Sequence, residues 1–442
     1  MTLDSEITLE RCVTAFAHWH STSRLARRNL LEAWLQHYRL ATEELAHLIT
    51  QETGKPITLA QGEVQRGVAT LQATIEAIGT FGEEAVPYDV MDGAESCRAT
   101  LRRFPRGPVL AITPFNFPVN LALHKLAPAL GAGCSVIWKP CPQAPRLATR
   151  LFEIFEAARR STGAPDHVLQ LAQVEPAEAE VLATDARITV VSFTGSERVG
   201  LHLQDILRGK PLTLELGGNA AVVLDAGIDA EWAAQQLAPA AVAGAGQSCC
   251  KAQRFYVHRE LWDAFVPAFV AAVKALPVGD PMDPKVRVGP LIDEAAAIRM
   301  EAALDAAVAQ GAQVLLRGTR QGNLLPPAVL TGVDETNFLV CEECFSPISV
   351  MIPVGSFEEG LEKASATRFG LRASAYSRDA RHLQRAATRL RAGGVLLNLP
   401  PTFRLDAAPF GGLGHSGNGL EGPRWAMETF TEARLIVEGP AR

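Results

Sequence analysis

The spacing of hydrophobic residues changes along the chain, and each spacing predicts a type of element. Up to about residue 80, apolar positions recur three and four residues apart, as in Leu30, Leu31, Trp34 and Leu35, which predicts helices. Residues 85–105 place a glycine-containing turn between short extended stretches, which predicts a hairpin. From Val109 onward, short β-branched runs alternate with longer helical patterns; the runs are VLAIT, SVIWK, VLQL, ITVVSF and LTLEL.

Such alternation is typical of a parallel sheet covered by helices on both faces, so a nucleotide-binding domain is the first interpretation. A second α/β block is expected after it, with strands near RFYV, ISVMIP, SAYS and VLLN. We therefore predict an α/β protein in three parts. They are a cofactor-binding domain of residues 1–84 and 106–217 with 416–429, a catalytic domain of residues 218–415, and a small β oligomerisation module of residues 85–105 and 430–442.

Composition narrows the class of protein. A hydrophobic share of 48% over 442 residues is ordinary for a globular chain of more than one domain. The net charge is −6 and the basic residues are scattered, so nucleic acid and membranes are not expected partners. The first residues lack a secretory pattern, which favours a cytoplasmic protein with free cysteines. Cys341 and Cys344 have CxxC spacing without a second pair or a histidine partner, so no metal is expected.

Two motifs offer chemistry at single residues. Cys249 and Cys250 lie in the glycine-rich stretch GQSCC, where a thiol could project into a cleft; alternatively, both are small buried hydrophobes. Glu215 ends an apolar strand and precedes two glycines. Apolar surroundings raise the pKa of a carboxyl towards the range of a general base, although such a glutamate can also simply pair with Lys or Arg.

Three further motifs follow strands, where ligands collect in open α/β sheets. Asn116 in TPFNFP could donate to an oxyanion, or it could satisfy the backbone of its own turn. The segment FTGSERVG, residues 193–200, follows a strand and opens a helix, so its free N–H groups suit a phosphate. Lys139 could meet ribose or phosphate, or it could be a solvated surface lysine.

The motifs together resemble the aldehyde dehydrogenase superfamily over roughly Leu9 to Val437; they are PFNFP with HKLAPALGAG, IWKP, FTGSERVG, LELGG, GQSCCKAQR, EECFSP and PFGGLGHSGNG. The resemblance implies an aldehyde dehydrogenase-like α/β fold with a Rossmann-type cofactor domain. It also implies NAD or NADP as cofactor and a homodimer or homotetramer. The implied reaction oxidises an aldehyde to its acid through a cysteine thiohemiacetal and a thioester.

By the same resemblance, Cys249 is the nucleophile, Glu215 is the general base, and Asn116 with the Cys249 N–H receives the oxyanion. Cys250 falls on a position that is not used for attack. The residues expected to contact the cofactor are Thr113, Pro114, Lys139, Gly195, Ser196, Gly200, Glu343 and Phe345. Pro142 stands where members that prefer NAD often carry an acid, which leaves NADP or both cofactors open, with Arg146 nearby.

The segment PPTFRLDAAPFGG and the pair His124-Lys125 are similar to the branch that handles lactaldehyde, phosphonoacetaldehyde and glyceraldehyde-3-phosphate. A small, polar or anionic aldehyde is therefore expected. Ser248 replaces an arginine of the phosphate-handling members, which argues against a doubly charged substrate. The expected substrate pocket contains Phe117, His124, Ser248, Phe403, Arg404 and Phe410, with Asn120 near His124. The alternatives are an internal hydrogen bond for His124 and an ion pair with Asp406 or Glu421 for Arg404.

Three other functions compete with this interpretation. In a CoA-acylating dehydrogenase, CoA would intercept the thioester, but members of that type commonly lack the base glutamate. A cysteine-dependent esterase or thioesterase would need a histidine to activate Cys249, and none lies near it in sequence. A silent binding protein would have no reason to keep Cys249, Glu215 and Asn116 together.

Overall fold

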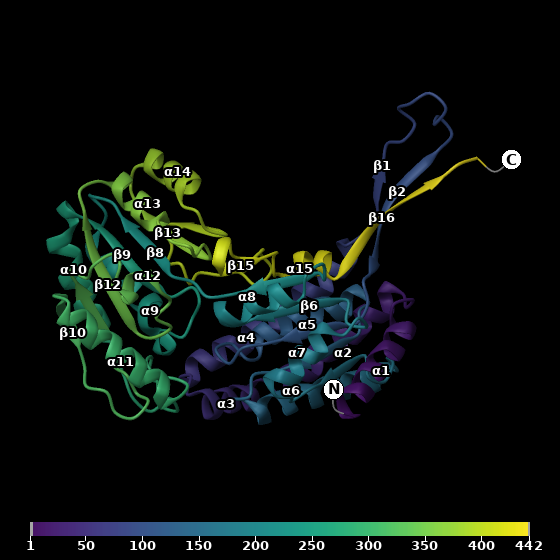
Figure 1. Ribbon diagram of the computed structural model, residues 1–442, viewed down its shortest axis with the longest axis horizontal. Helices are drawn as coiled ribbons and strands as arrows, with labels where there is room; N and C mark the ends of the chain where they lie inside the picture. The colour runs from purple at the N-terminus through teal and green to yellow at the C-terminus, as the bar shows by residue number, and fades with distance from the viewer. Residues whose placement is uncertain (1–2, 441–442) are drawn as a thin grey trace.

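Three β-sheets organise the chain, and the α/β class predicted from the alternating pattern is confirmed. The computed structural model describes residues 3–440. It shows two lobes side by side and a β arm that projects from one of them (Figure 1). We call the lobe built on the six-stranded sheet the first lobe and the lobe built on the seven-stranded sheet the second lobe.

The first lobe's sheet has the order β15-β7-β6-β3-β4-β5, and only β15 runs antiparallel to its neighbour. Its strands are β3 (Val109–Ile112), β4 (Val136–Lys139), β5 (Leu169–Leu171), β6 (Val190–Thr194), β7 (Leu212–Glu215) and β15 (Gly417–Asn418). The helices are α1 (Leu3–Trp19), α2 (Arg24–Leu40), α3 (Thr42–Thr53), α4 (Ile57–Thr80), α5 (Asn120–Ala132), α6 (Pro145–Thr162), α7 (Pro176–Thr184), α8 (Glu197–Ile206) and α15 (Pro423–Thr429).

Strand alternation explains why helices cover both faces of this sheet. Val109 and Ala111 pack in the core formed with α2 to α6, whereas Leu110 lies in the opposite core beside Leu9 of α1 and Leu203 of α8. Successive side chains of a strand point to opposite faces, so a short, fully apolar strand needs cover on both. The helices predicted from the spacing before residue 80 are present as α1 to α4.

The second lobe's sheet has the order β10-β11-β12-β9-β8-β13-β14, in which only β10 is antiparallel to its neighbour. Its strands are β8 (Ala220–Leu224), β9 (Ala252–His258), β10 (Gln313–Arg317), β11 (Ala328–Thr331), β12 (Ile348–Val354), β13 (Arg372–Tyr376) and β14 (Gly394–Leu397). The helical segments are α9 (Ala230–Val242), η1 (Ala243–Gly246), α10 (Arg259–Lys274), α11 (Glu294–Ala309), α12 (Phe338–Cys341), α13 (Phe357–Ser365), α14 (Ala380–Arg389) and η2 (Gly414–Ser416).

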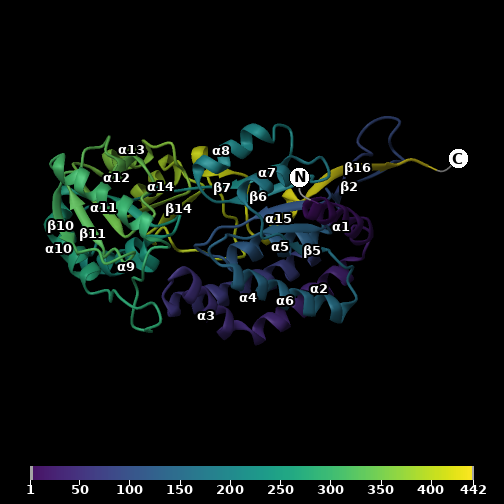
Figure 2. The same cartoon turned by 60° about the horizontal axis from the view of Figure 1, so that its bottom comes forward.

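The arm is the third sheet, in the order β1 (Glu84–Val86), β2 (Arg98–Pro105) and β16 (Thr431–Glu438). β16 pairs antiparallel with all of β2, so the chain's last strand joins a hairpin more than 300 residues earlier. The arm stands clear of both lobes in the two views (Figures 1 and 2). It exposes apolar side chains; these include Val90, Met91, Leu435 and Val437.

Candidate active site

The loop before Cys249 holds an unusual backbone conformation. Ala245 has φ 56° and Gly246 has φ 65°, both in the left-handed region. That region is costly for alanine, so a surrounding contact must hold it. A β-carbon on Gly246 would lie 2.3 Å from the carbonyl oxygen of Ser346, so only glycine permits this approach. The loop is therefore held in one shape immediately before the cysteine pair.

Cys249 lies where two cavities meet. A smaller cavity of about 480 Å³ and a larger cavity of about 890 Å³ are both lined by Phe115, Asn116, Leu121 and Cys249. Cys250 lines only the smaller cavity. One sulfur can thus be reached from both sides, and the Asn116 side chain, which the sequence placed more than 100 residues away, lies at the same junction.

The two thiols share a hydrogen bond, with their Sγ atoms 3.8 Å apart. This bond lowers the pKa of Cys250 to about 7, against the opposing effect of burial. The same bond and burial raise the pKa of Cys249 well above its usual value. Because either sulfur can donate the shared proton, the pair loses one proton readily and the second only with difficulty.

Glu215 ends β7 and is buried at 1% exposure. Among residues 3–440 neither of its carboxylate oxygens has a hydrogen-bond partner. Burial, and then the nearby charge of Glu421, raise its pKa well above the usual value. Burial is also the largest effect on Glu421, but Lys125, which is hydrogen-bonded to it, together with His124 and Arg404 lowers the pKa of Glu421 overall. The pKa values of the two carboxyls are therefore shifted in opposite directions, upward for Glu215 and downward for Glu421.

The glycines after Glu215 allow three functional segments to meet. A β-carbon on Gly217 would lie 2.5 Å from Oε2 of Glu343, and one on Gly218 would lie 2.2 Å from the carbonyl oxygen of Cys249. The Gly218 N–H also donates to Oε1 of Glu343 over 2.9 Å. The sequence motif LELGG thus brings Glu215, Cys249 and Glu343 together because it lacks side chains at two close approaches.

The larger cavity extends from Cys249 to the start of α8. Seven of the eight residues expected to contact a cofactor line it; they are Thr113, Pro114, Lys139, Gly195, Ser196, Glu343 and Phe345. Ser196 is the N-cap of α8 and makes no side-chain cap bond, so the first N–H groups of the helix are available to a phosphate. Burial lowers the pKa of Lys139 and raises the pKa of Glu343 to about 7. These features fit a dinucleotide.

Gly200 and Arg146 lie outside this cavity. A β-carbon on Gly200 would lie 2.2 Å from the Leu216 side chain, so Gly200 lets α8 pack against the end of β7. Its expected contact with a cofactor stays a prediction that the lining of this cavity does not support. Arg146 donates to Glu52 over 3.1 Å and its side chain is 64% exposed. Pro142, by contrast, lines the cavity.

Four of the six expected pocket residues line the smaller cavity; they are Phe117, Ser248, Arg404 and Phe410. His124 and Phe403 do not line it. His124 is fully buried, its Nε2 lies 3.0 Å from Asp406, and burial lowers its pKa to about 4. Phe403 is 53% exposed at the surface. The α5 face that carries His124 packs inside the protein, on α4, and Phe403 is exposed, so this structure supports a pocket role for neither residue.

Sequence reasoning missed three charged residues of the smaller cavity, which lie on α4 and in the turn between α3 and α4. Lys55, Glu63 and Arg66 all line it. Nζ of Lys55 lies 3.9 Å from the centroid of the Phe117 ring and donates to Glu63. Arg66 binds Asp406 with two bonds of 3.0 and 2.8 Å. The available signal was Glu63, a charged residue on the apolar face of a helical pattern.

Comparison with known proteins agrees with this fold and site. The aldehyde dehydrogenase family model matches residues 4–436. The chain is 37% identical to 3-sulfolactaldehyde dehydrogenase of Priestia aryabhattai over 89% of this chain and 82% of that protein. It superposes with a TM-score of 0.95 on aldehyde dehydrogenase 21 of Physcomitrella patens in complex with the product succinate, at 32% identity over 99% of this chain and 90% of the other.

A glyceraldehyde-3-phosphate dehydrogenase of Methanocaldococcus jannaschii complexed with NADP also superposes with a TM-score of 0.95, at 31% identity over 99% of this chain and 94% of that one. The class of protein is thus a nicotinamide-dependent oxidoreductase that acts on aldehydes. The chain belongs to the aldehyde dehydrogenase family, and its cofactor is NAD or NADP. Within residues 3–440, no helix is both long and apolar enough to span a membrane.

Proposed function

We propose that this protein oxidises a small anionic aldehyde to its carboxylic acid through a thioester on Cys249. The observation that carries the proposal is the position of Cys249 at the junction of two cavities. An aldehyde in the smaller cavity and a dinucleotide in the larger one would both reach the same sulfur. The first lobe, with α8, would hold most of the dinucleotide, and the second lobe supplies the nucleophile.

The proposed mechanism follows from the protonation of each group. When the hydrogen-bonded thiol pair loses one proton and the remaining proton lies on Cys250, Cys249 is the thiolate that attacks the aldehyde carbon. Asn116 and the Cys249 N–H donate to the oxyanion. NAD(P), when bound, would accept the hydride that leaves the substrate carbon. Glu215, once deprotonated, takes a proton from water, which hydrolyses the thioester on Cys249.

The charges of the smaller cavity support an anionic substrate. Arg404 lies under this cavity with its side chain 10% exposed and its guanidinium 3.9 Å from the Phe410 centroid. Among residues 3–440 its Nε has no hydrogen-bond partner, and Asp406 is 3.8 Å away. Asp406 already accepts two bonds from Arg66. Arg404 is therefore the cation best able to bind a carboxylate or sulfonate.

Two finer points complete the proposal. Pro142 places no carboxylate against a 2′-phosphate, and Lys139 offers a cation, so NADP is accepted as well as NAD. The exposed apolar residues of the arm, with the free edge of β16, support a homodimer or homotetramer. Light scattering that gave a monomer at working concentration would contradict the assembly.

The experiment that tests the function measures reduced nicotinamide by absorbance. Wild type and Cys249→Ser are mixed with NAD or NADP and a panel of neutral, carboxylated, sulfonated and phosphorylated aldehydes. We expect a signal only with wild type, strongest with a singly charged acid group. A wild type that reduces neither cofactor with any aldehyde, while iodoacetamide still alkylates Cys249 rapidly, would favour acyl transfer or hydrolysis. Acyl-CoA formed in the presence of CoA would identify the acylating alternative.

A further inference from the structure

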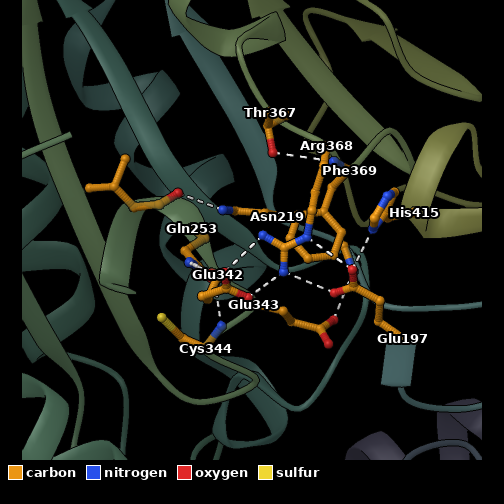
Figure 3. A network of polar contacts seen from close by, with 12 residues as sticks. Glu197, Asn219, Gln253, Glu342, Glu343, Cys344, Thr367, Arg368, Phe369 and His415 are labelled. Atoms are coloured by element: carbon orange, nitrogen blue, oxygen red, sulfur yellow. Dashed lines mark hydrogen bonds and ion pairs between the residues drawn. The ribbon is translucent and has the colours of Figure 1, made fainter. Parts of the chain in front are cut away.

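An ionic cluster of Arg368, Glu197, Glu342 and His415 joins the two lobes (Figure 3). Arg368 lies between α13 and β13 of the second lobe. Its Nε donates to Oε1 of Glu197 in the first lobe, and its Nη2 donates to Oε2 of the same residue, both over 2.9 Å. The same guanidinium donates from Nη1 to Glu342 over 2.8 Å and also bonds it through Nη2. One arginine therefore binds two carboxylates, each through two bonds.

His415 closes the cluster. Its Nδ1 lies 2.6 Å from Oε1 of Glu197, and its backbone N–H donates to the carbonyl of Arg368 over 3.0 Å. A β-carbon on Gly414 would lie 2.6 Å from that same carbonyl, so the glycine before His415 lets the loop pack against Arg368. The C-terminal loop PFGGLGHSGNG thus lies on top of the lobe-to-lobe contact.

Each carboxylate of the cluster adjoins a residue of the larger cavity. Glu197 is the first residue of α8 and directly follows Ser196, where free N–H groups suit a phosphate. Glu342 directly precedes Glu343 in the chain. Gln253 fixes the backbone on both sides of Glu343, because it donates to the Glu342 carbonyl over 2.7 Å and accepts the Cys344 N–H over 3.0 Å (Figure 3).

The position of Glu197 poses an electrostatic problem for a dinucleotide. A carboxylate in the first turn of α8 stabilises the helix but repels a phosphate bound at the same end. Hydrogen bonds from Arg368 lower the pKa of Glu197, so this group stays ionised. The Arg368 guanidinium binds the carboxylates of both Glu197 and Glu342 and offsets their charge, and His415 also lies against Glu197.

We propose that Arg368 is a positioning residue for the dinucleotide: it neutralises Glu197 beside the phosphate site and ties the start of α8 to the segment that carries Glu343. The inference rests on the proposed placement of NAD(P) in the larger cavity. Isolated exposed ion pairs contribute little, and the Arg368 side chain is itself 34% exposed, but it binds two carboxylates bidentately within a network. Arg368 therefore acts on cofactor affinity from outside the reacting atoms.

The test measures the dissociation constant for NADP+ by titration calorimetry, without aldehyde, so that catalysis does not enter. Arg368→Ala is expected to raise the constant about tenfold, which corresponds to the loss of one charge-assisted interaction. Glu197→Gln on that background removes the unbalanced carboxylate and is expected to restore most of the affinity, so the two changes are non-additive. Arg385→Ala, which removes an exposed ion pair between Arg385 of α14 and Glu358 of α13, is the matched control and should bind NADP+ as wild type does.

Salt gives a second readout that a purely structural role would not move. High ionic strength screens exposed charges, so the ratio between the constants of Arg368→Ala and wild type should shrink as salt rises. A dissociation constant of Arg368→Ala for NADP+ within twofold of the wild-type value would overturn the inference. So would a loss of affinity that becomes larger when Glu197→Gln is added to Arg368→Ala. If wild type itself binds neither NADP+ nor NAD+, the proposed function fails and this inference fails with it; normal wild-type binding separates the two failures.

Discussion

The carbonyl oxygen of Cys249 packs against Gly218 so closely that a β-carbon at Gly218 would lie 2.2 Å from it. The segment that carries Glu215, the proposed base, and the loop that carries Cys249, the proposed nucleophile, are thus in direct contact. A clash between the backbone of Cys249 and a side chain at residue 218 could not be relieved by rotating a side chain of Cys249, because the contacting atom belongs to the backbone. The relative position of the thiol and the carboxyl is therefore set by the absence of a side chain at residue 218.

Gly218→Ala is expected to displace Cys249 and to lower kcat by about 10²-fold, because shifts of about 1 Å at a reacting group have effects of that size. Steady-state rates and the rate of Cys249 alkylation would measure the change. Gly79→Ala in α4 is the control, since its added methyl meets nothing within 4 Å and should leave activity unchanged. Full activity in Gly218→Ala would contradict the proposed contact.

Cys249→Ser is expected to abolish NAD(P)H formation, with a fall of about 10⁴-fold or more, because a serine hydroxyl is not activated here as the thiol is. Cys250→Ser should cost less than about tenfold, since it keeps a hydrogen-bonding neighbour for Cys249. It should also change the pH at which Cys249 is alkylated, because the two thiols share one proton. Equal activity of the two variants would contradict the assignment of the nucleophile.

If Glu215 is the base, the rate of thioester hydrolysis should rise with pH. Its folded pKa lies well above the usual value, so at low pH the carboxyl is protonated and cannot act as a base. Hydrolysis therefore increases as pH rises through that raised pKa. Glu215→Gln should lose this limb and accumulate the acyl-enzyme, seen as one equivalent of NAD(P)H per subunit in a burst. A pH profile that Glu215→Gln leaves unchanged would exclude Glu215 as the base.

Asn116→Ala removes one donor to the oxyanion and should raise the activation barrier by about 3 kcal/mol, roughly a hundredfold loss in kcat. The midpoint of thermal unfolding should change little, because Asn116 lies at the wall of two cavities and not in a packed core. Rapid-quench kinetics and calorimetry would measure the two quantities. A loss of activity that merely follows a loss of stability would argue for a structural role.

Arg404→Met should raise KM for a carboxylated or sulfonated aldehyde about tenfold or more, while a neutral aldehyde of the same length is little affected. Methionine keeps a long apolar stem against Phe410, so the packing changes less than the charge. Arg66→Met is the comparison, and it should also unfold at a lower temperature because it leaves buried Asp406 without its bidentate partner. Equal effects of Arg404→Met on charged and neutral aldehydes would contradict an anion at Arg404.

Local patterns were sufficient for the elements and for the fold class. The helices α1 to α4 follow from the spacing of residues such as Leu30 and Trp34, and the strands β3 to β7 follow from short apolar runs. The same patterns were not sufficient for side chains on a fully buried helix. In α5 every residue is buried, so spacing cannot tell which face meets a cavity. His124 was expected in the pocket because it shares a helix face with Asn120; its Nε2 lies against Asp406 and against Arg404.

The sequence by itself determined the α/β class, the family resemblance, and the identity of the residues proposed for the chemistry, because each of these depends on short segments whose order is fixed along the chain. The tertiary structure decided which distant charges meet. Arg66 and Asp406 pair across 340 positions, and Glu197 and Arg368 pair across 171. Such pairings depend on how two lobes pack, and ion pairs have no spacing rule outside a single helix or strand. The charges that line the smaller cavity and the ionic cluster of Arg368 could therefore be found only from the tertiary structure.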